Sequence, residues 1–81
     1  MIEIARLHKL DNDSALKAFV DVVVEEAFVI KGVRVIKGKK GLFVGMPITQ
    51  GKDGKWYSVV EISNGDLKKE FQDIVLAAYN A

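Results

Sequence analysis

The chain has 81 residues, a formal net charge of +1, no cysteine and one histidine. This length allows a single domain, residues 1–81, and the lack of cysteine excludes a disulfide framework and a Cys/His zinc site. Because so short a chain buries only about 60–65% of its unfolded surface, we expect homodimer formation to add stability.

The first quarter of the chain predicts two strands. Residues 2–10 alternate weakly, and the Asp-Asn-Asp-Ser sequence at 11–14 is typical of a turn. The strongest strand pattern covers 16–24, with small and β-branched residues on one face. These residues are Leu16, Ala18, Val20, Val22 and Val24. Glu25 and Glu26 interrupt the pattern, and we place them at a solvated strand end where adjacent side chains point to opposite faces.

The middle of the chain predicts a hairpin. Residues 27–30 resume a strand that ends at Gly32, and 33–37 form the next strand. The Gly-Lys-Lys-Gly sequence at 38–41 is a hairpin tip, because its glycines can adopt positive φ. A strand at 42–46 follows.

The region after this hairpin contains Pro47, which cannot donate to a ladder and ends the preceding strand or places it at an edge. We expect residues 48–52 to be irregular. Asp53-Gly54 indicates a second hairpin, of type I′, leading into a strand at 55–62.

The last quarter predicts an amphipathic helix. Ser63 or Asn64 is a suitable N-cap, and apolar residues then recur at helical spacing. The stripe consists of Leu67, Phe71, Ile74, Val75 and Ala78. Leu76 falls almost opposite the stripe with Tyr79 on its flank, so we expect these two residues at a dimer interface, although an exposed Leu is equally common without a partner. The predicted fold is α+β: an antiparallel sheet of about five strands with the C-terminal helix packed on it.

Few residues are suited to catalysis. His8 is the one candidate general base, and its strand setting favours a surface role. Glu25 and Glu26 would point to opposite faces and could not act on one bond. We therefore expect no enzyme activity, no catalytic or metal-binding residues, no cofactor and no small-molecule substrate. The first ten residues contain the charged Glu3, Arg6 and Lys9, which excludes the apolar segment of a secretory signal. No apolar run approaches the roughly 20 residues that span a bilayer, which predicts a cytoplasmic protein without a membrane partner.

Positive charge is concentrated in residues 31–55, which contain seven Lys and Arg residues and one Asp. Lysines on hairpin tips suit phosphate backbones, and nearby Trp56 and Tyr57 could stack on bases. The alternative is that the lysines promote solubility and Trp56 faces the core. The candidate nucleic-acid-binding residues are Arg34, Lys37, Lys39, Lys40, Lys52 and Lys55.

Four segments form a recognisable combination: Glu-Ala-Phe-Val-Ile at 26–30, Arg-Val-Ile at 34–36, Gly-Leu-Phe-Val-Gly-Met-Pro at 41–47 and Asp-Gly at 53–54. Together they resemble the SpoVG family of small bacterial regulators. The resemblance implies a sheet-plus-helix fold, a homodimer that binds DNA or RNA, a role in sporulation and septation, and no enzyme activity or cofactor.

One family feature does not carry over. Relatives have a basic pair shortly after Met-Pro, where this chain has Thr49 and Gln50. The hairpin lysines would have to replace that pair. The alternative is a protein–protein interaction module that acts in cell division or development without touching nucleic acid.

Overall fold

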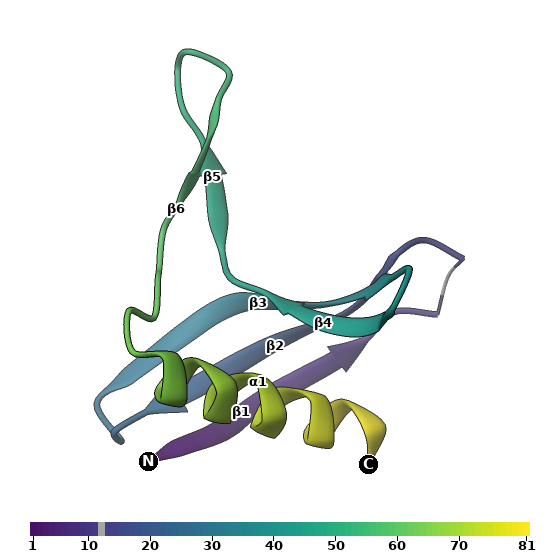
Figure 1. Cartoon of the computed structure of the whole chain (residues 1–81), viewed down its shortest axis with the longest axis vertical. Coiled ribbons are helices and arrows are strands. Elements are labelled where there is room, and N and C mark those ends of the chain that lie inside the picture. Colours follow the sequence, from purple (N-terminus) through teal and green to yellow (C-terminus); the bar gives the residue numbers. More distant parts are fainter. Residues whose placement is uncertain (12) are drawn as a thin grey trace.

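The computed structural model describes residues 1–11 and 13–81, so Asn12 of the predicted turn lies outside the described residues. One sheet is antiparallel with the order β1-β2-β3-β4, a second pairs β5 with β6, and a helix follows (Figure 1). The elements are β1 (Ile2–Lys9), β2 (Leu16–Val24), β3 (Phe28–Gly38), β4 (Gly41–Gly45), β5 (Ile48–Gln50), β6 (Trp56–Ser58) and α1 (Gly65–Asn80). The α+β class and the C-terminal helix are confirmed. The described strands form two sheets, whereas about five strands in one sheet were predicted.

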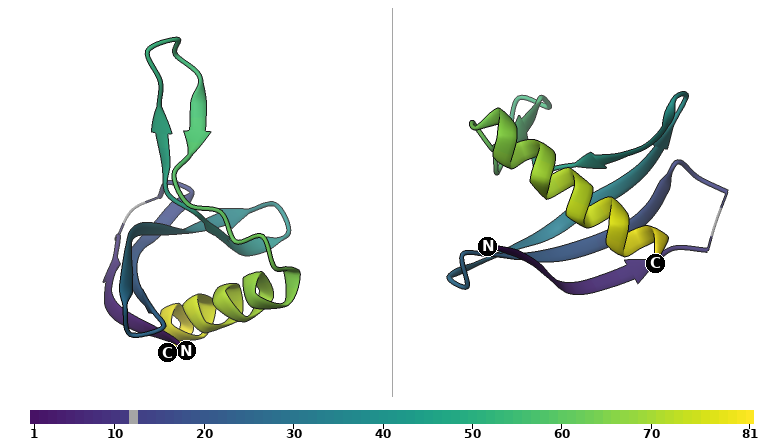
Figure 2. Two further views of the ribbon diagram at one scale, coloured as in Figure 1. Left: turned by 90° about the vertical axis from the view of Figure 1, so that its left-hand side faces the viewer. Right: turned by 60° about the horizontal axis from the view of Figure 1, so that its bottom comes forward.

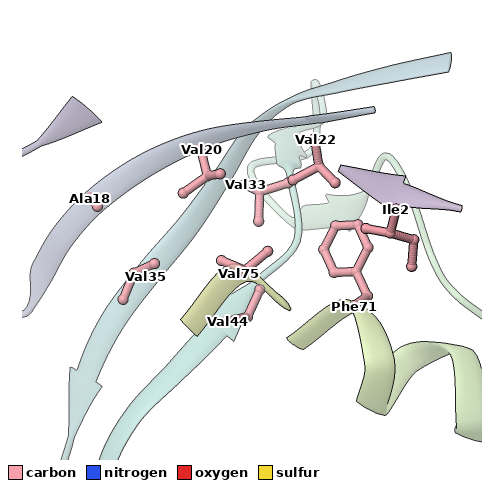
Figure 3. Packing of buried hydrophobic residues seen from close by; sticks show 9 residues of the cluster. All are labelled: Ile2, Ala18, Val20, Val22, Val33, Val35, Val44, Phe71 and Val75. Atoms are coloured by element: carbon pink, nitrogen blue, oxygen red, sulfur yellow. The ribbon is translucent and has the colours of Figure 1, made fainter. Parts of the chain in front are cut away.

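The inner face of β2 lies at the centre of the core. Ala18, Val20 and Val22 are fully buried, as the alternation predicted. β2 pairs with β1 on one side and with β3 on the other, which places Val20 between Leu7 and Val33. Figure 3 shows the buried cluster, which consists of Ile2, Ala18, Val20, Val22, Val33, Val35, Val44, Phe71 and Val75.

Helix α1 covers one face of the four-stranded sheet (Figure 2). It begins after Asn64, whose side chain accepts a hydrogen bond from the Leu67 N–H at 3.0 Å, which confirms one of the two predicted caps. Phe71 and Val75 lie one turn apart and are buried against the valines of the sheet (Figure 3). Burying a side chain such as Phe71 stabilises the fold by about 2–3 kcal/mol. Within residues 1–11 and 13–81, no helix is long and apolar enough to cross a membrane.

Strand β3 is one continuous strand, although the sequence predicted two strands at 27–30 and 33–37. Gly32 has φ +81° and forms a β-bulge, in which Lys31 and Gly32 together lie opposite Asp21 of β2. The prediction of a strand end at Gly32 is wrong because β2 continues past this point and keeps pairing with β3 on both sides of the bulge.

Glu25 and Glu26 form the turn between β2 and β3, so their predicted placement on a strand is wrong. Both have φ +54°, and the Ala27 N–H donates to the Val24 carbonyl at 3.1 Å. Positive φ at two successive residues is the feature of a type I′ turn, in which Asn-Gly is the favoured pair. A residue with a Cβ costs roughly 1–2 kcal/mol in the left-handed region, so the turn is strained and is held by the pairing of the strands that flank it.

Strands β5 and β6 form an arm that projects from the rest of the fold (Figures 1 and 2). Residues 48–52 were predicted to be irregular, but Ile48–Gln50 pairs with Trp56–Ser58. The strand predicted at 55–62 is shorter in the structure, where β6 covers only Trp56–Ser58. Every residue of both strands is exposed. Because a two-stranded hairpin is at best marginally stable in water, we expect the arm to gain stability from a partner.

The strain in the β2–β3 turn predicts that Glu26→Gly stabilises the protein. Removing the Cβ should raise the free energy of unfolding by about 1 kcal/mol, which corresponds to a rise in Tm of roughly 4–8 °C for a domain of this size. Thermal unfolding followed by circular dichroism measures the effect. Glu26→Gln is the matched control, because it removes the charge and keeps the Cβ. An unchanged or lower Tm for Glu26→Gly would contradict the assigned turn strain.

Candidate nucleic-acid interface

The β3–β4 turn presents two lysines to solvent. Lys39 and Lys40 occupy the turn between Gly38 and Gly41, which are paired across the hairpin. Gly41 has φ +123°, a backbone conformation that residues with a side chain rarely adopt. The predicted hairpin tip at 38–41 is therefore confirmed, and both lysines are exposed at the end of the sheet.

Two further lysines approach this turn from neighbouring strands. Lys17 of β2 and Lys37 of β3 line a shallow polar depression together with Lys39. Among the described residues that line it, Asp13 is the one acid. We call Lys17, Lys37, Lys39 and Lys40 the sheet-end lysines. Their convergence raises the local positive potential, which attracts phosphate.

Lys52 and Lys55 lie elsewhere, in the loop 51–55 that joins β5 to β6. This loop is the tip of the arm, which points away from the β3–β4 turn (Figure 1). The structure therefore divides the predicted basic surface into two groups. The predicted type I′ turn at Asp53-Gly54 is also wrong, because Gly54 (φ +83°) has positive φ whereas Asp53 does not.

Hydrogen bonds centred on Asp53 fix the tip of the arm. The Tyr57 hydroxyl donates to Asp53 Oδ2 at 2.5 Å, and the Lys55 N–H donates to Oδ1 at 2.9 Å. Across the loop, the Gln50 side-chain amide donates to the Gly54 carbonyl at 3.0 Å. The Tyr57 hydroxyl, followed by the Lys55 N–H, holds the pKa of Asp53 below its usual value, and the same hydroxyl–carboxylate bond raises the pKa of Tyr57.

Arg34 lies in the middle of β3, apart from both groups of lysines. Its side chain is on the face of the sheet opposite α1, because its neighbours Val33 and Val35 are buried on the helix side. The guanidinium carbon lies 5.8 Å from the centre of the Phe19 ring. Sequence reasoning selected Arg34 and missed Phe19, since the strand register that joins them is not apparent from either segment alone.

The predicted dimer residues Leu76 and Tyr79 are both partly buried against the chain's own core. The Lys9 ammonium lies 5.1 Å from the centre of the Tyr79 ring. Their role at a dimer interface stays a prediction.

A different surface exposes more apolar area. Phe28, Val29 and Val59 are 69%, 52% and 58% exposed and line a groove at the base of the arm. Pro47 and Val60 line it where the chain enters and leaves the arm, and Val24 and Ile30 complete the apolar lining. We call this surface the arm-base groove. Sequence reasoning missed it because residues 28–29 and 59–60 come together only in the folded chain.

A cluster of metal ligands is not found within the described residues: no three His, Asp or Glu side chains are grouped to hold an ion. His8 lies with Arg6, Phe19 and Asp21 around a shallow depression on the sheet face opposite the helix.

Comparison with known proteins identifies relatives along the whole chain. The SpoVG family model matches residues 1–81. Proteins named "Putative septation protein SpoVG" from Staphylococcus aureus (strain JH9) and Staphylococcus haemolyticus (strain JCSC1435) are each 41% identical over 75 residues. The aligned region covers 93% of this chain and 75% of each relative. The resemblance drawn from the motifs is confirmed.

The contacts of Asp53 predict its titration. We expect the carboxyl midpoint, measured by carbon-13 NMR, to lie below the ordinary value of about 3.9 and to rise towards it in Tyr57→Phe. Because the folded-state pKa is the lower one, the contact stabilises the arm above the unfolded-state pKa, and this stability is lost as pH falls through the folded-state pKa. Tyr79→Phe removes a hydroxyl far from the arm and is the control. Equal midpoints in the wild type and Tyr57→Phe would contradict this account.

Proposed function

Because this chain belongs to the SpoVG family, we propose that it is a small dimeric regulator of gene expression that binds DNA or RNA. The observation that supports this most directly is the convergence of three sheet-end lysines, Lys17, Lys37 and Lys39, around one depression, with Lys40 next to Lys39 in the turn. Lysine ammonium groups bind phosphate oxygens as point charges and do not distinguish sequences. The proposed contact is therefore with the backbone of the nucleic acid.

The sheet-end lysines replace the basic pair that relatives carry shortly after Met-Pro. In this chain Thr49 and Gln50 occupy that position, on the exposed strand β5. Lys52 and Lys55 lie just beyond, at the tip of the arm. Two basic groups on one protomer would contact two separated stretches of backbone.

The proposed dimer is formed through the arm and the arm-base groove. Among the described residues the arm pairs with no strand beyond its own two, and it exposes Ile48 (43%), Trp56 (63%) and Tyr57 (48%). Unpaired strand edges and contiguous exposed apolar side chains favour association. The groove lies at the base of the arm, where the chain enters and leaves it. A second copy that places its arm in this groove would cover the groove and the exposed strands of the arm together.

A second candidate is an interaction module in which the same groove receives a different protein and the charge promotes solubility. The exposure of Phe28 favours this reading. Affinity capture from cell extract with and without nuclease separates the two candidates. A specific partner that is retained after nuclease treatment and released by Phe28→Ser would support the module.

Salt dependence tests the nucleic-acid proposal. The sheet-end lysines alone give four phosphate contacts per protomer, or about eight per dimer, so the slope of log K against log salt should be about −7 or steeper for duplex DNA. Affinity should then fall on the order of 10⁴-fold between 50 and 200 mM salt. Fluorescence anisotropy with labelled duplex and single-stranded probes measures both quantities. A slope near zero for every probe would contradict the proposal.

Charge reversal locates the contact. Lys39→Glu with Lys40→Glu should weaken binding to all sequences alike and make the salt slope shallower. The matched control is Lys68→Glu with Lys69→Glu, an adjacent exposed pair on the first turns of α1. Equal loss in the two double variants would indicate a general charge effect and would not support a site at the end of the sheet.

The dimer is tested by light scattering over a dilution series. The wild type should have twice the mass of the 81-residue chain, and Phe28→Ser should shift it towards the monomer by removing an exposed ring from the groove. Phe43→Ser is the matched control, because Phe43 is a similarly exposed ring (49%) on the far face of the sheet. A monomeric wild type at every concentration would contradict the proposal.

A further inference from the structure

The four-stranded sheet has a second face that α1 does not cover (Figure 2). A row of residues crosses this face at one level, because the register places His8 opposite Phe19, Phe19 opposite Arg34 and Arg34 opposite Gly45. Each strand thus contributes one position to the row. Phe19 and Arg34 are half-buried in it and His8 is exposed, so the row combines an aromatic ring with basic groups.

A second aromatic ring lies on the same face, nearer the β3–β4 turn. Phe43 is opposite Ile36, two residues along β3 from Arg34. Its ring lies over Gly38, where an added Cβ would come within 3.0 Å of Phe43 Cε1. The backbone therefore supports one side of the ring, and the ring is still 49% exposed.

Arg34 has unused hydrogen-bonding capacity. Its Nε is shielded from solvent and has no hydrogen-bond partner among the described residues. The guanidinium lies near the Phe19 ring, which orients it by cation–π attraction. The enclosed Nε does not itself reach a ligand, but a guanidinium held in place offers its terminal N–H donors to a phosphate or to the acceptor edge of a base.

We propose that this open face binds single-stranded nucleic acid, with bases stacked on Phe19 and Phe43 and Arg34 contacting the strand between them. The proposal rests on the nucleic-acid function proposed above and adds a second site and a preference for unpaired bases. Aromatic rings on an open sheet stack on splayed bases, whereas the bases of a duplex are already stacked on each other.

The geometry of the face suits an extended strand. Two strand spacings across the sheet and two residues along it separate the Cα atoms of Phe19 and Phe43 by roughly 12 Å. That distance is on the order of two nucleotide steps of an extended strand. Beyond Phe43 the face ends at Lys39 and Lys40, so a strand that crosses the rings would continue onto the sheet-end lysines.

The charge of the face favours nucleic acid over a second copy of the chain. Arg34 is near the middle of the face, with Arg6 and His8 towards β1, Asp21 beside them and Glu3 farther along β1. A face-to-face dimer would set the basic middle of this face against a second basic surface, which is unfavourable without an intervening anion. A polyanion supplies that charge.

The test compares a 12-nucleotide oligouridine with an RNA duplex of the same length by fluorescence anisotropy. Phe19→Leu and Phe43→Leu keep apolar bulk and remove the π-face, and each should weaken single-strand binding about tenfold while changing duplex binding less than twofold. Arg34→Lys keeps the charge and loses the planar fork, and it should also weaken single-strand binding. Lys69→Gln is the matched charge control, at an exposed residue of α1 far from this face, and should bind as the wild type does.

A second measurement locates the site directly. Photocrosslinking to a 4-thiouridine oligonucleotide, followed by mass spectrometry, should label peptides from β2 and β4. Circular dichroism and light scattering check that each variant keeps its fold and oligomeric state.

The outcomes separate the two proposals. If no probe binds the wild type, the proposed function fails. If probes bind with a steep salt slope but Phe19→Leu and Phe43→Leu bind as the wild type does, the lysine contact stands and the stacking site is wrong. If these variants change the oligomeric state instead, the open face is an interface between copies and the stacking site is also wrong.

Discussion

The contact on which the rest of the molecule depends is the seating of Phe71 and Val75 in the valine face of the sheet. A chain of 81 residues without cysteine has no disulfide to hold it, so helix α1 must bury its apolar stripe against the sheet to form a core. The buried side chains of the described residues all belong to this cluster. Because one helix covers one face, the other face of the sheet is left to solvent, and this asymmetry makes it available for ligands.

Regular periodicity predicted the elements that form the core. The period of two at 16–24 and the helical spacing that includes Phe71 each repeat over enough residues to define a buried face. Elements held by a few local contacts could not be predicted in this way. Strand β5 has three exposed residues, so no hydrophobic pattern marks it. The turn at Glu25 and Glu26 lacks the residues that favour it, and the pairing of β2 with β3 imposes it.

The candidate site was predictable only in part, for a related reason. Lys39 and Lys40 could be assigned to a turn because glycines flank them in the sequence. The aromatic positions depend on register: Phe19 and Arg34 are adjacent through the pairing of β2 with β3, which their own segments do not specify. Phe43 lies within an apolar run, and strand alternation alone does not say which of its residues faces the helix.

The bulge at Gly32 determines how the two exposed surfaces are divided. Strict alternation from Val33 would place Val29 on the helix side and Phe28 on the open face. The extra residue reverses this beyond the bulge, so Phe28 points towards the arm-base groove, while Arg34, on the other side of the bulge, stays on the open face. Among the described residues no atom lies within 4 Å of a Cβ built at Gly32, so the glycine is required by its φ of +81° and not by space. A substitution that removed the bulge would turn residues 28–31 of β3 to the opposite face of the sheet. The backbone conformation at Gly32 therefore keeps the apolar surface at Phe28 separate from the basic surface at Arg34.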